Sequence, residues 1–313
     1  MFTPYILLVI QLNYVIILFE KITVKEAAMT DNNNSSAKNA FLFGSPVSHS
    51  ISPAMHNLSF KILGINANYT AIDIDLDNIE SVTKYIRNDD FLGANVTMPL
   101  KNDIGKYIDR YDTSARLSYC LNTIVPKNGE LVGYTTDGAG FVDSLYNNDI
   151  DVKNRSILIL GIGGAARSII VKCAFEGAKS ITIAVRNVNK LRVPSEFSTD
   201  IESETSCPIK IIQLDSDIMK VAIDESDIII NATPVGMIDN NCLIDKKYLK
   251  PSHIVCDLIY KPNMTKLLLN AKACGCKYMN GKDMLLYQGA RSFKLWIGKD
   301  MPINEVKKMY FTD

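Results

Sequence analysis

The stretch "RSILILGIGGAARSIIVKCAFEGAKSITIAVRN", residues 155–187, decides the fold of the second half of the chain. It opens with a continuous apolar strand at 157–160, passes through a run of glycines, and continues as a helix from about Ala165. A second apolar strand at 181–185 completes a βαβ unit within about 30 residues, the length of a dinucleotide-binding fingerprint. The stretch therefore predicts a Rossmann-type nucleotide-binding domain.

The turn between this first strand and its helix is suited to a pyrophosphate. Its glycines permit a tight turn and a close approach of the backbone, and the helix N-terminus offers unpaired N–H groups and a positive dipole end. A tight strand-to-helix turn without any ligand is the alternative interpretation. The predicted phosphate-binding loop consists of Gly161, Ile162, Gly163, Gly164 and Ala165.

The end of the second strand indicates which nucleotide binds. An NAD site usually has an acidic residue there, hydrogen-bonded to the ribose 2′-hydroxyl. This chain has "AVRNVNK" instead, with Arg186, Asn187 and Lys190 and no acid. These residues favour the 2′-phosphate of NADP, with NAD still possible, although Arg186 and Lys190 as solvated surface residues are the alternative.

The composition excludes several classes of function. The chain has 313 residues, enough for two domains, and its 34 basic and 34 acidic residues give no net charge. A balanced charge argues against nucleic acid or an anionic membrane as partner. Seven cysteines without paired metal spacing, together with only three histidines, argue against a zinc enzyme. We expect free thiols in a reducing compartment, which predicts a cytoplasmic protein.

The sequence pattern of residues 1–39 does not indicate that they belong to either domain. The apolar run "YILLVIQLNYVIILF" (5–19) is shorter than the ~20 residues of a membrane span, and no basic segment precedes it. The polar "MTDNNNSSAKNA" that follows is of a kind expected to be disordered. We expect a disordered extension or a misassigned start, with Met29 as the true one, and a membrane anchor is the alternative.

From Ala40 the chain alternates short apolar strands with helical segments, which is typical of βα units. The predicted domains are a mixed-sheet α/β substrate domain at 40–138, a nucleotide domain at 139–275, and a segment at 276–313 that packs back on the substrate domain. Expected strands lie at 40–43, 68–75, 91–97, 120–126 and 131–136, the last two joined by an Asn128-Gly129 hairpin turn, and expected helices lie at 51–63, 76–88, from Asp137 onward, and 282–298.

Polar residues gather in four stretches of the first domain. "GSPVSHSISPAMHN" (44–57) places Ser50 and Ser52 before a helix, where capping is the alternative role. In "GANVTMPLK" (93–101), Asn95 and Thr97 share one face of an extended strand that leads to Lys101. "CLNTI" (120–124) offers Asn122, and "GYTTDGAGF" (133–141) offers Asp137 at a helix start, where an N-cap is the alternative.

Three further stretches lie in the second half. "NATPVGM" (231–237) follows an apolar strand, so Asn231 and Gly236 are expected where ligands lie in such sheets, and a plain turn is the alternative. Gln288 lies in the last predicted long helix, and Tyr260 lies near "DLIYKP" as a weaker candidate.

In this order, the motifs "HSISP", "NVTMPLK", "NTI", "TDG", "GIGGAAR", "NATPVGM" and "GKDMLLYQGARSFKLWIG" resemble the shikimate dehydrogenase family, including its quinate/shikimate branch. The resemblance runs from Phe41 to the C-terminus. The chain departs from it at Thr135, where the family usually has Asn, at Cys120-Leu121, where a small residue and Val are usual, and at Val185, where Asn is common.

The resemblance implies reversible NADPH-dependent reduction of 3-dehydroshikimate to shikimate, by a monomer or a homodimer. The alternatives are a quinate/shikimate dehydrogenase that uses NAD or both cofactors, and a nucleotide-binding regulator without turnover. It implies Lys101 and Asp137 as the catalytic pair, which also contacts the substrate. The other implied substrate residues are Ser50, Ser52, Asn95, Thr97, Asn122, Tyr260 and Gln288, and the implied cofactor residues are the 161–165 loop, Arg186, Asn187, Lys190, Asn231, Thr233, Gly236 and Gly281.

Lys101 would then lie in a cleft between the domains, near Asp137. A nearby opposite charge favours the ammonium form and desolvation opposes it. A lysine held in this way can act as a general acid or base, an effect worth about 10²–10⁴-fold. A surface lysine at the start of a helix is the alternative for Lys101 alone.

Overall fold

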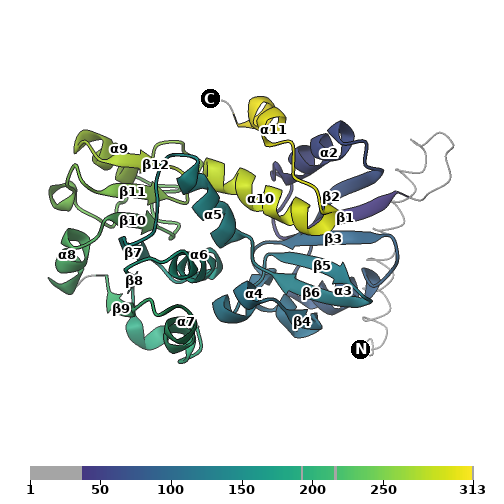
Figure 1. Ribbon diagram of the computed structural model, residues 1–313, viewed down its shortest axis with the longest axis horizontal. Helices are drawn as coiled ribbons and strands as arrows, with labels where there is room; N and C mark the ends of the chain where they lie inside the picture. Colours follow the sequence, from purple (N-terminus) through teal and green to yellow (C-terminus); the bar gives the residue numbers. More distant parts are fainter. Residues whose placement is uncertain (1–36, 192, 215–216, 312–313) are drawn as a thin grey trace, which may run out of the picture. The chain divides into compact units, whose positions relative to one another are not determined.

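The computed structural model describes residues 37–191, 193–214 and 217–311, which form two compact units (Figure 1). The first unit takes in the described residues up to Arg110 together with Ile124–Val132, and the second takes in Tyr111–Thr123 and the chain from Gly133 onward. The predicted fold class, a mixed-sheet α/β domain followed by a Rossmann-type domain, is confirmed. The prediction for 1–39 lies outside the described residues except at 37–39, and the predicted domain boundaries stay predictions.

Within its described residues the first unit is built on a six-stranded sheet of order β2-β1-β3-β5-β6-β4. Strand β1 pairs in parallel with both β2 and β3. Strands β5 and β6 form the expected hairpin, and Asn128 and Gly129 both have positive φ, as this turn requires. The strands are β1 (Lys38–Gly44), β2 (Ala67–Asp73), β3 (Phe91–Val96), β4 (Arg110–Tyr111), β5 (Thr123–Lys127) and β6 (Glu130–Tyr134).

The helices of the first unit follow the sequence with one difference. Helix α2 (Ser52–Ile62) has Pro53 in its first turn, as predicted. The helix expected at 76–88 is instead a 3₁₀ turn, η1 (Leu76–Asn78), followed by α3 (Ile79–Tyr85). Asn78 donates a hydrogen bond to Asp75 at 2.7 Å, a local side-chain bond of the kind that competes with a regular helix. The 3₁₀ turns η2 (Leu100–Asn102) and η3 (Ile104–Tyr107) follow β3.

The described part of the second unit contains a six-stranded sheet of order β12-β11-β10-β7-β8-β9, in which each neighbouring pair is parallel. Numbered from β7, this is the 3-2-1-4-5-6 order of a dinucleotide-binding fold. The strands predicted at 157–160 and 181–185 each begin one residue earlier. The bounds are β7 (Ser156–Leu160), β8 (Ser180–Val185), β9 (Ile209–Gln213), β10 (Ile228–Asn231), β11 (Ile254–Asp257) and β12 (Lys277–Met279).

Helices cover both faces of this sheet because its strands are apolar on both (Figure 1). Successive side chains of a strand point to opposite faces, so Ile157 and Ile159 pack in the core under α5 and α6, and Leu158 and Leu160 pack in the core under α8 and α9. The helices of the unit are α4 (Thr113–Ser118), α5 (Asp137–Tyr146), α6 (Gly164–Phe175), α7 (Phe197–Thr205), α8 (Asp217–Asp224), α9 (Lys266–Ala273), α10 (Lys282–Ile297) and α11 (Ile303–Tyr310). Two 3₁₀ turns, η4 (Val188–Lys190) and η5 (Lys246–Tyr248), complete it.

Helix α5 packs unusually closely on its two neighbours. A Cβ at Gly138 would lie 2.1 Å from the carbonyl oxygen of Ser168 on α6, and a Cβ at Gly140 would lie 2.3 Å from the backbone nitrogen of Gln288 on α10. Real Cβ atoms do not approach backbone atoms so closely. The two glycines therefore fix the position of α5, whose first residue is Asp137.

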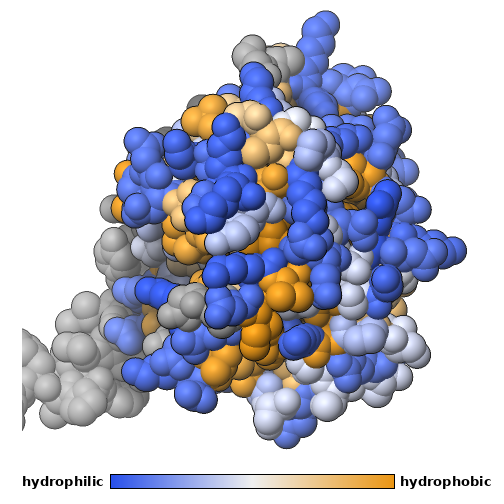
Figure 2. Space-filling model, turned by 90° about the vertical axis from the view of Figure 1, so that its left-hand side faces the viewer, coloured by the Kyte–Doolittle hydropathy of each residue, from blue (hydrophilic) through white to orange (hydrophobic). Residues whose placement is uncertain are grey.

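Hydrophilic residues cover most of the face shown in Figure 2, with hydrophobic residues gathered near its middle. None of the helices in the described ranges is long and apolar enough to cross a membrane. All seven cysteines lie in the described part of the chain and are free thiols, as the sequence predicted.

We expect Gly140→Ala to lower the free energy of unfolding by roughly 1–3 kcal/mol, the usual cost of overpacking, although alanine is the better helix former. The matched control is Gly163→Ala, whose Cβ would meet no atom within 4 Å. This control should stay within about 1 kcal/mol of the wild type. Urea unfolding followed by circular dichroism compares the two, and a Gly140→Ala variant as stable as the wild type would contradict the packing argument.

Candidate functional site

In the second unit, three of the predicted substrate residues, Asn122, Asp137 and Gln288, lie together at the start of α5. Asp137 is the first residue of this helix, and the N-cap position belongs to Thr136, so Asp137 is not the N-cap of the alternative interpretation. The Asp137 side chain is buried, and its Oδ1 accepts a hydrogen bond of 2.7 Å from Asn122 Nδ2. A buried carboxylate at a helix start is also favoured by the helix dipole.

Asn122 is the centre of this polar cluster. Its Nδ2 also donates to Thr136 Oγ1 at 3.0 Å and to Gln288 Oε1 at 3.4 Å, and its Oδ1 accepts from the Thr136 backbone N–H at 2.7 Å. The structure therefore brings together Asn122, Asp137 and Gln288, which lie on three separate segments of the sequence.

Three hydroxyls that were not predicted complete the cluster. Thr123 Oγ1 lies 2.8 Å from Ser292 Oγ, and Thr136 Oγ1 lies 3.1 Å from the same atom. Ser292 is one helical turn after Gln288 on α10, so the i,i+4 spacing was a signal that it faces the same way. Thr123 and Thr136 each adjoin a predicted residue in the sequence.

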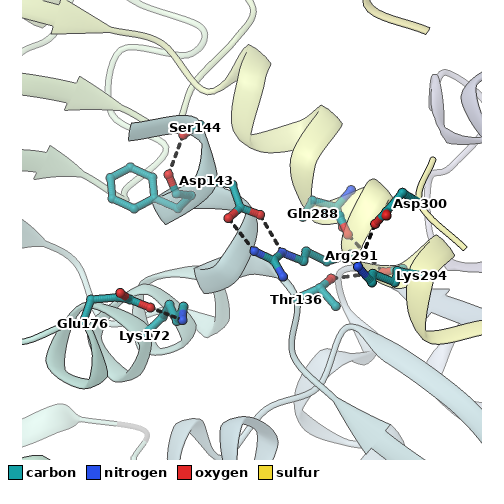
Figure 3. A network of polar contacts seen from close by, with 11 residues as sticks. Thr136, Asp143, Ser144, Lys172, Glu176, Gln288, Arg291, Lys294 and Asp300 are labelled. Carbon is teal, nitrogen blue, oxygen red and sulfur yellow. Dashed lines mark hydrogen bonds and ion pairs between the residues drawn. The ribbon is translucent and has the colours of Figure 1, made fainter. Parts of the chain in front are cut away.

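An ion pair outside the cluster attaches α5 to α10, as Figure 3 shows. Arg291 binds both carboxylate oxygens of Asp143, each at 2.6 Å. This bidentate geometry is the strongest form of such a pair. Burial of charge is incomplete there, so we treat the pair as an alignment device for the two helices rather than as a major source of stability.

In the first unit, Asn95 near the end of β3 is buried, and its Oδ1 accepts a hydrogen bond of 2.9 Å from the Tyr69 hydroxyl. The Tyr69 ring stacks on His56 of α2, with centroids 4.4 Å apart. Burial raises the pKa of Tyr69 and lowers the pKa of His56 to about 3. A neutral histidine thus stacks on the neutral tyrosine that donates to Asn95, and neither residue was predicted to belong to the site.

The remaining candidates of the first unit lie around the start of α2 and the end of β3. Ser52 is buried, and its backbone N–H donates to Ser50 Oγ at 3.2 Å. The N-cap of α2 is Ile51, without a side-chain cap bond, so neither serine is the cap residue. Thr97 is anchored by its N–H to the Phe43 carbonyl at 2.8 Å. Lys101 follows in η2 and is partly buried.

The glycine loop after β7 has the predicted form. Gly161 has φ +97°, and a Cβ there would lie 2.9 Å from Thr233 Cγ2, so only glycine allows the loops after β7 and β10 to meet. The strand order of the sheet reverses between β7 and β10. In sheets of this type, ligands usually bind beyond the carboxyl ends of the strands at such a point. Gly163 is the N-cap of α6, and the space around its Cβ position is open. The loop therefore fits a pyrophosphate.

After β8, Arg186 and Lys190 are exposed, and no acidic residue lies between them. Asn187 Oδ1 accepts a hydrogen bond of 2.9 Å from the Asn189 N–H, so part of its role is to cap the short turn η4. Two exposed cations with no acid between them in the sequence fit a ribose 2′-phosphate better than a 2′-hydroxyl.

The turn after β10 is held by a buried carboxylate that was not predicted. Asn231 Nδ2 donates to Asp257 Oδ1 at 3.0 Å, and Asn231 Oδ1 accepts from Thr233 Oγ1 at 2.7 Å. Asp257 Oδ2 accepts from Thr265 Oγ1 at 2.6 Å, and burial raises the pKa of Asp257. Gly236 has φ +94°, as expected for this turn. Asp257 is the last residue of β11, as Asn231 is the last residue of β10. This shared position at the end of an apolar strand was the sequence signal that could have identified Asp257.

The other two candidates of the second unit follow β11. A Cβ at Gly281 would lie 2.0 Å from the Leu258 carbonyl oxygen, so this glycine allows α10 to begin directly against the chain that leaves β11. Tyr260 is exposed. Among the described residues no group of three or more His, Cys, Asp or Glu side chains is arranged to hold a metal ion.

The chain is similar to proteins of known family along most of its length. Residues 42–124 match the family model of the shikimate dehydrogenase substrate binding domain, and residues 281–308 match that of the shikimate 5′-dehydrogenase C-terminal domain. A shikimate dehydrogenase (NADP+) of Alkaliphilus metalliredigens is 39% identical over 272 residues, covering 86% of this chain and 94% of that protein.

Two solved structures extend this similarity to the fold. A shikimate 5-dehydrogenase of Listeria monocytogenes, in complex with shikimate and NAD, is 34% identical with a TM-score of 0.84, covering 90% of this chain and 99% of that one. A shikimate 5-dehydrogenase of Thermus thermophilus, in complex with NADP(H) and shikimate, is 29% identical with a TM-score of 0.74, covering 87% of this chain and 97% of that one.

The buried His56 predicts a pH dependence of stability. Its folded pKa of about 3 lies below its unfolded value near 6.5, so only the unfolded chain binds this proton between those pH values. The stability contributed by neutral His56 is therefore complete above about pH 6.5 and falls by up to about 1.4 kcal/mol per pH unit as the pH drops toward 3.

The variant His56→Phe keeps a ring against Tyr69 and removes the titration. We expect it to lose less stability than the wild type between pH 6.5 and 4.5, measured by urea unfolding. The difference between the two proteins at pH 8, where His56 is neutral in both states, reports packing alone and serves as the control. Parallel pH profiles of the two proteins would rule out the assigned role of His56.

Proposed function

Because the chain belongs to the shikimate dehydrogenase family, we propose that it catalyses the reversible NADPH-dependent reduction of 3-dehydroshikimate to shikimate. The observation that carries the proposal is the hydrogen-bonded cluster of Asn122, Asp137 and Gln288, three residues expected at the substrate. The proposal is also supported by the glycine loop after β7, whose form suits a dinucleotide.

The substrate is a cyclohexene acid with a carboxylate and several hydroxyls, so it needs many neutral hydrogen-bonding groups. The chain offers hydroxyls and amides for these, with few charges among them. We propose that the ring substituents are bound by Ser50, Ser52, Asn95, Thr97, Asn122, Tyr260 and Gln288, in addition to Lys101 and Asp137.

Reduction of the ring ketone adds a hydride to its carbon and a proton to its oxygen. The nicotinamide supplies the hydride when it is bound. We propose that the Lys101 ammonium group stabilises the negative charge that develops on the oxygen and that Lys101 and Asp137 together deliver the proton. Asn122 holds the Asp137 carboxylate by a 2.7 Å hydrogen bond, so the acid–base group is oriented before the substrate arrives. The oxidation of shikimate uses the same groups in reverse.

For the cofactor we propose NADP. The 161–165 loop would bind the pyrophosphate, and Arg186, Asn187 and Lys190 would surround the adenosine 2′-phosphate. Asn231, Thr233, Gly236 and Gly281 would form the nicotinamide side. The Listeria relative was solved with NAD, so NAD is the alternative that the experiments below must distinguish.

We also propose the location, the class of ligand and the oligomeric state of the protein. A cytoplasmic location is supported by the seven free thiols, which suit a reducing compartment. The balanced charge supports small-molecule ligands rather than nucleic acid. The oligomeric state, monomer or homodimer, and the return of 276–313 to the substrate domain also belong to this proposal.

The first experiment is the initial rate of oxidation of shikimate and of quinate by the full chain, each with NADP and with NAD, followed by absorbance of the reduced nicotinamide. We expect turnover of shikimate with NADP. Comparable turnover of quinate, or a preference for NAD, would assign the chain to the quinate/shikimate branch, and absence of turnover in every pairing would leave a nucleotide-binding regulator.

Lys101→Ala should lower kcat for shikimate by about 10²–10⁴-fold, since it removes one member of the acid–base pair. The control is Lys106→Ala, which removes an exposed lysine that is paired with Asp103 on the protein surface. We expect this control to keep the wild-type kcat. A Lys101→Ala variant with more than half of the wild-type kcat would exclude the lysine from the chemistry.

Arg186→Ala tests the cofactor assignment. Loss of a charge-assisted bond to the 2′-phosphate should raise KM for NADP by about 10–100-fold and leave KM for NAD nearly unchanged, since bonds to charged groups contribute about 1.5–3 kcal/mol. The control is Arg155→Ala, an exposed arginine immediately before β7. Equal changes for both cofactors would show that Arg186 does not bind the 2′-phosphate.

A further inference from the structure

A single buried hydroxyl on α6 receives two hydrogen bonds from the segment that contains Asp137. Ser168 Oγ accepts from the Gly138 backbone N–H at 2.7 Å and from Thr135 Oγ1 at 2.8 Å. These two donors flank Thr136 and Asp137 in the sequence. Ser168 is buried.

Backbone contact reinforces these bonds. The Ser168 carbonyl oxygen lies so close to Gly138 that a Cβ there would be 2.1 Å away. Ser168 also lies one turn after Gly164, the first residue of α6, so the residue that touches the start of α5 belongs to the helix that opens at the phosphate-binding loop.

Packing alone does not hold this segment. Thr135, Thr136 and Ser168 line an open pocket of about 570 Å³, whose wall also includes Ala139 and Val171. Side chains that border a cavity have space into which they can move, because close packing is what restricts side chains elsewhere. On this side the position of the 135–138 segment therefore depends on its hydrogen bonds as well as on the backbone contact at Gly138.

We propose that Ser168 is a positioning residue for the reaction, which fixes Asp137 in its catalytic orientation by accepting these two bonds; the inference rests on the proposed function. Its hydroxyl does not touch the substrate. Without it, two buried donors lose their acceptor, and the 135–138 segment moves to satisfy them. A displacement of about 1 Å in a catalytic group lowers the rate by about 10²-fold.

The test is a single-turnover measurement of shikimate oxidation by the full chain, with the enzyme in excess over NADP and with saturating shikimate. The rate constant of a single turnover belongs to the folded, loaded enzyme, so loss of folded protein does not change it. We expect Ser168→Ala to lower this constant by about 10–100-fold, with KM for shikimate changed by less than about 3-fold.

The matched control is Ser144→Ala, which also removes a buried serine hydroxyl of the same region, one that donates to the Phe141 carbonyl within α5 (Figure 3). We expect the wild-type rate constant for it. Thr135→Val removes one of the two donors and keeps the bond from Gly138, so a smaller loss of about 3–10-fold is expected. Thr135→Ser keeps the hydroxyl and should restore the rate.

These variants separate the inference from the proposed function. A wild-type protein without turnover would overturn both. An active wild type whose Ser168→Ala and Thr135→Val variants match Ser144→Ala would overturn the inference alone. If Ser168→Ala does not fold, the comparison of Thr135→Val with Thr135→Ser decides, because equal rates for these two would also overturn it.

Discussion

The absence of side chains at Gly138 and Gly140 is the constraint on which the polar cluster depends. These glycines let α5 lie against the backbones of α6 and α10 at once. At that distance Asn122 reaches both Asp137 and Gln288 with one amide group. With any larger residue at 138 or 140 the helices would separate by more than the tolerance of a hydrogen bond, and the cluster would have to be made by other side chains.

Two buried polar side chains, Asn122 and Asp257, hold segments of the second unit together by several hydrogen bonds each. Asn122 uses both ends of its amide, and Asp257 accepts from a side-chain amide, a backbone N–H and a hydroxyl. Burial raises the pKa of Asp257, which is the cost of placing a carboxyl group there. The carboxyl group holds the loops after β10 and β11 in this arrangement, because Asn231, Ile259 and Thr265 all donate to it and would lose their acceptor in another one.

Sequence patterns predicted the features that depend on local spacing. The βαβ unit, the Asn128-Gly129 hairpin and helix α10 were found because apolar periodicity and turn chemistry are local. The helix expected at 76–88 was too long, because a side-chain bond near its start favours a tighter turn. The contacts of Asp257 and Ser168 were missed for a different reason. Their partners lie 26 and 30 or more residues away, and only the fold shows that they meet.

The departure at Thr135 can be explained on the same basis. The shikimate dehydrogenase family usually has Asn at this position, which has two donors and an acceptor on its side chain. Thr135 donates its one hydroxyl proton to Ser168, and its backbone N–H and carbonyl both bond to Ser114 Oγ at 3.2 Å. Its hydrogen-bonding groups therefore serve α4 and α6 rather than a ligand. Thr135 thus helps to hold the start of α5, where Asn122 bonds to Asp137 and Gln288.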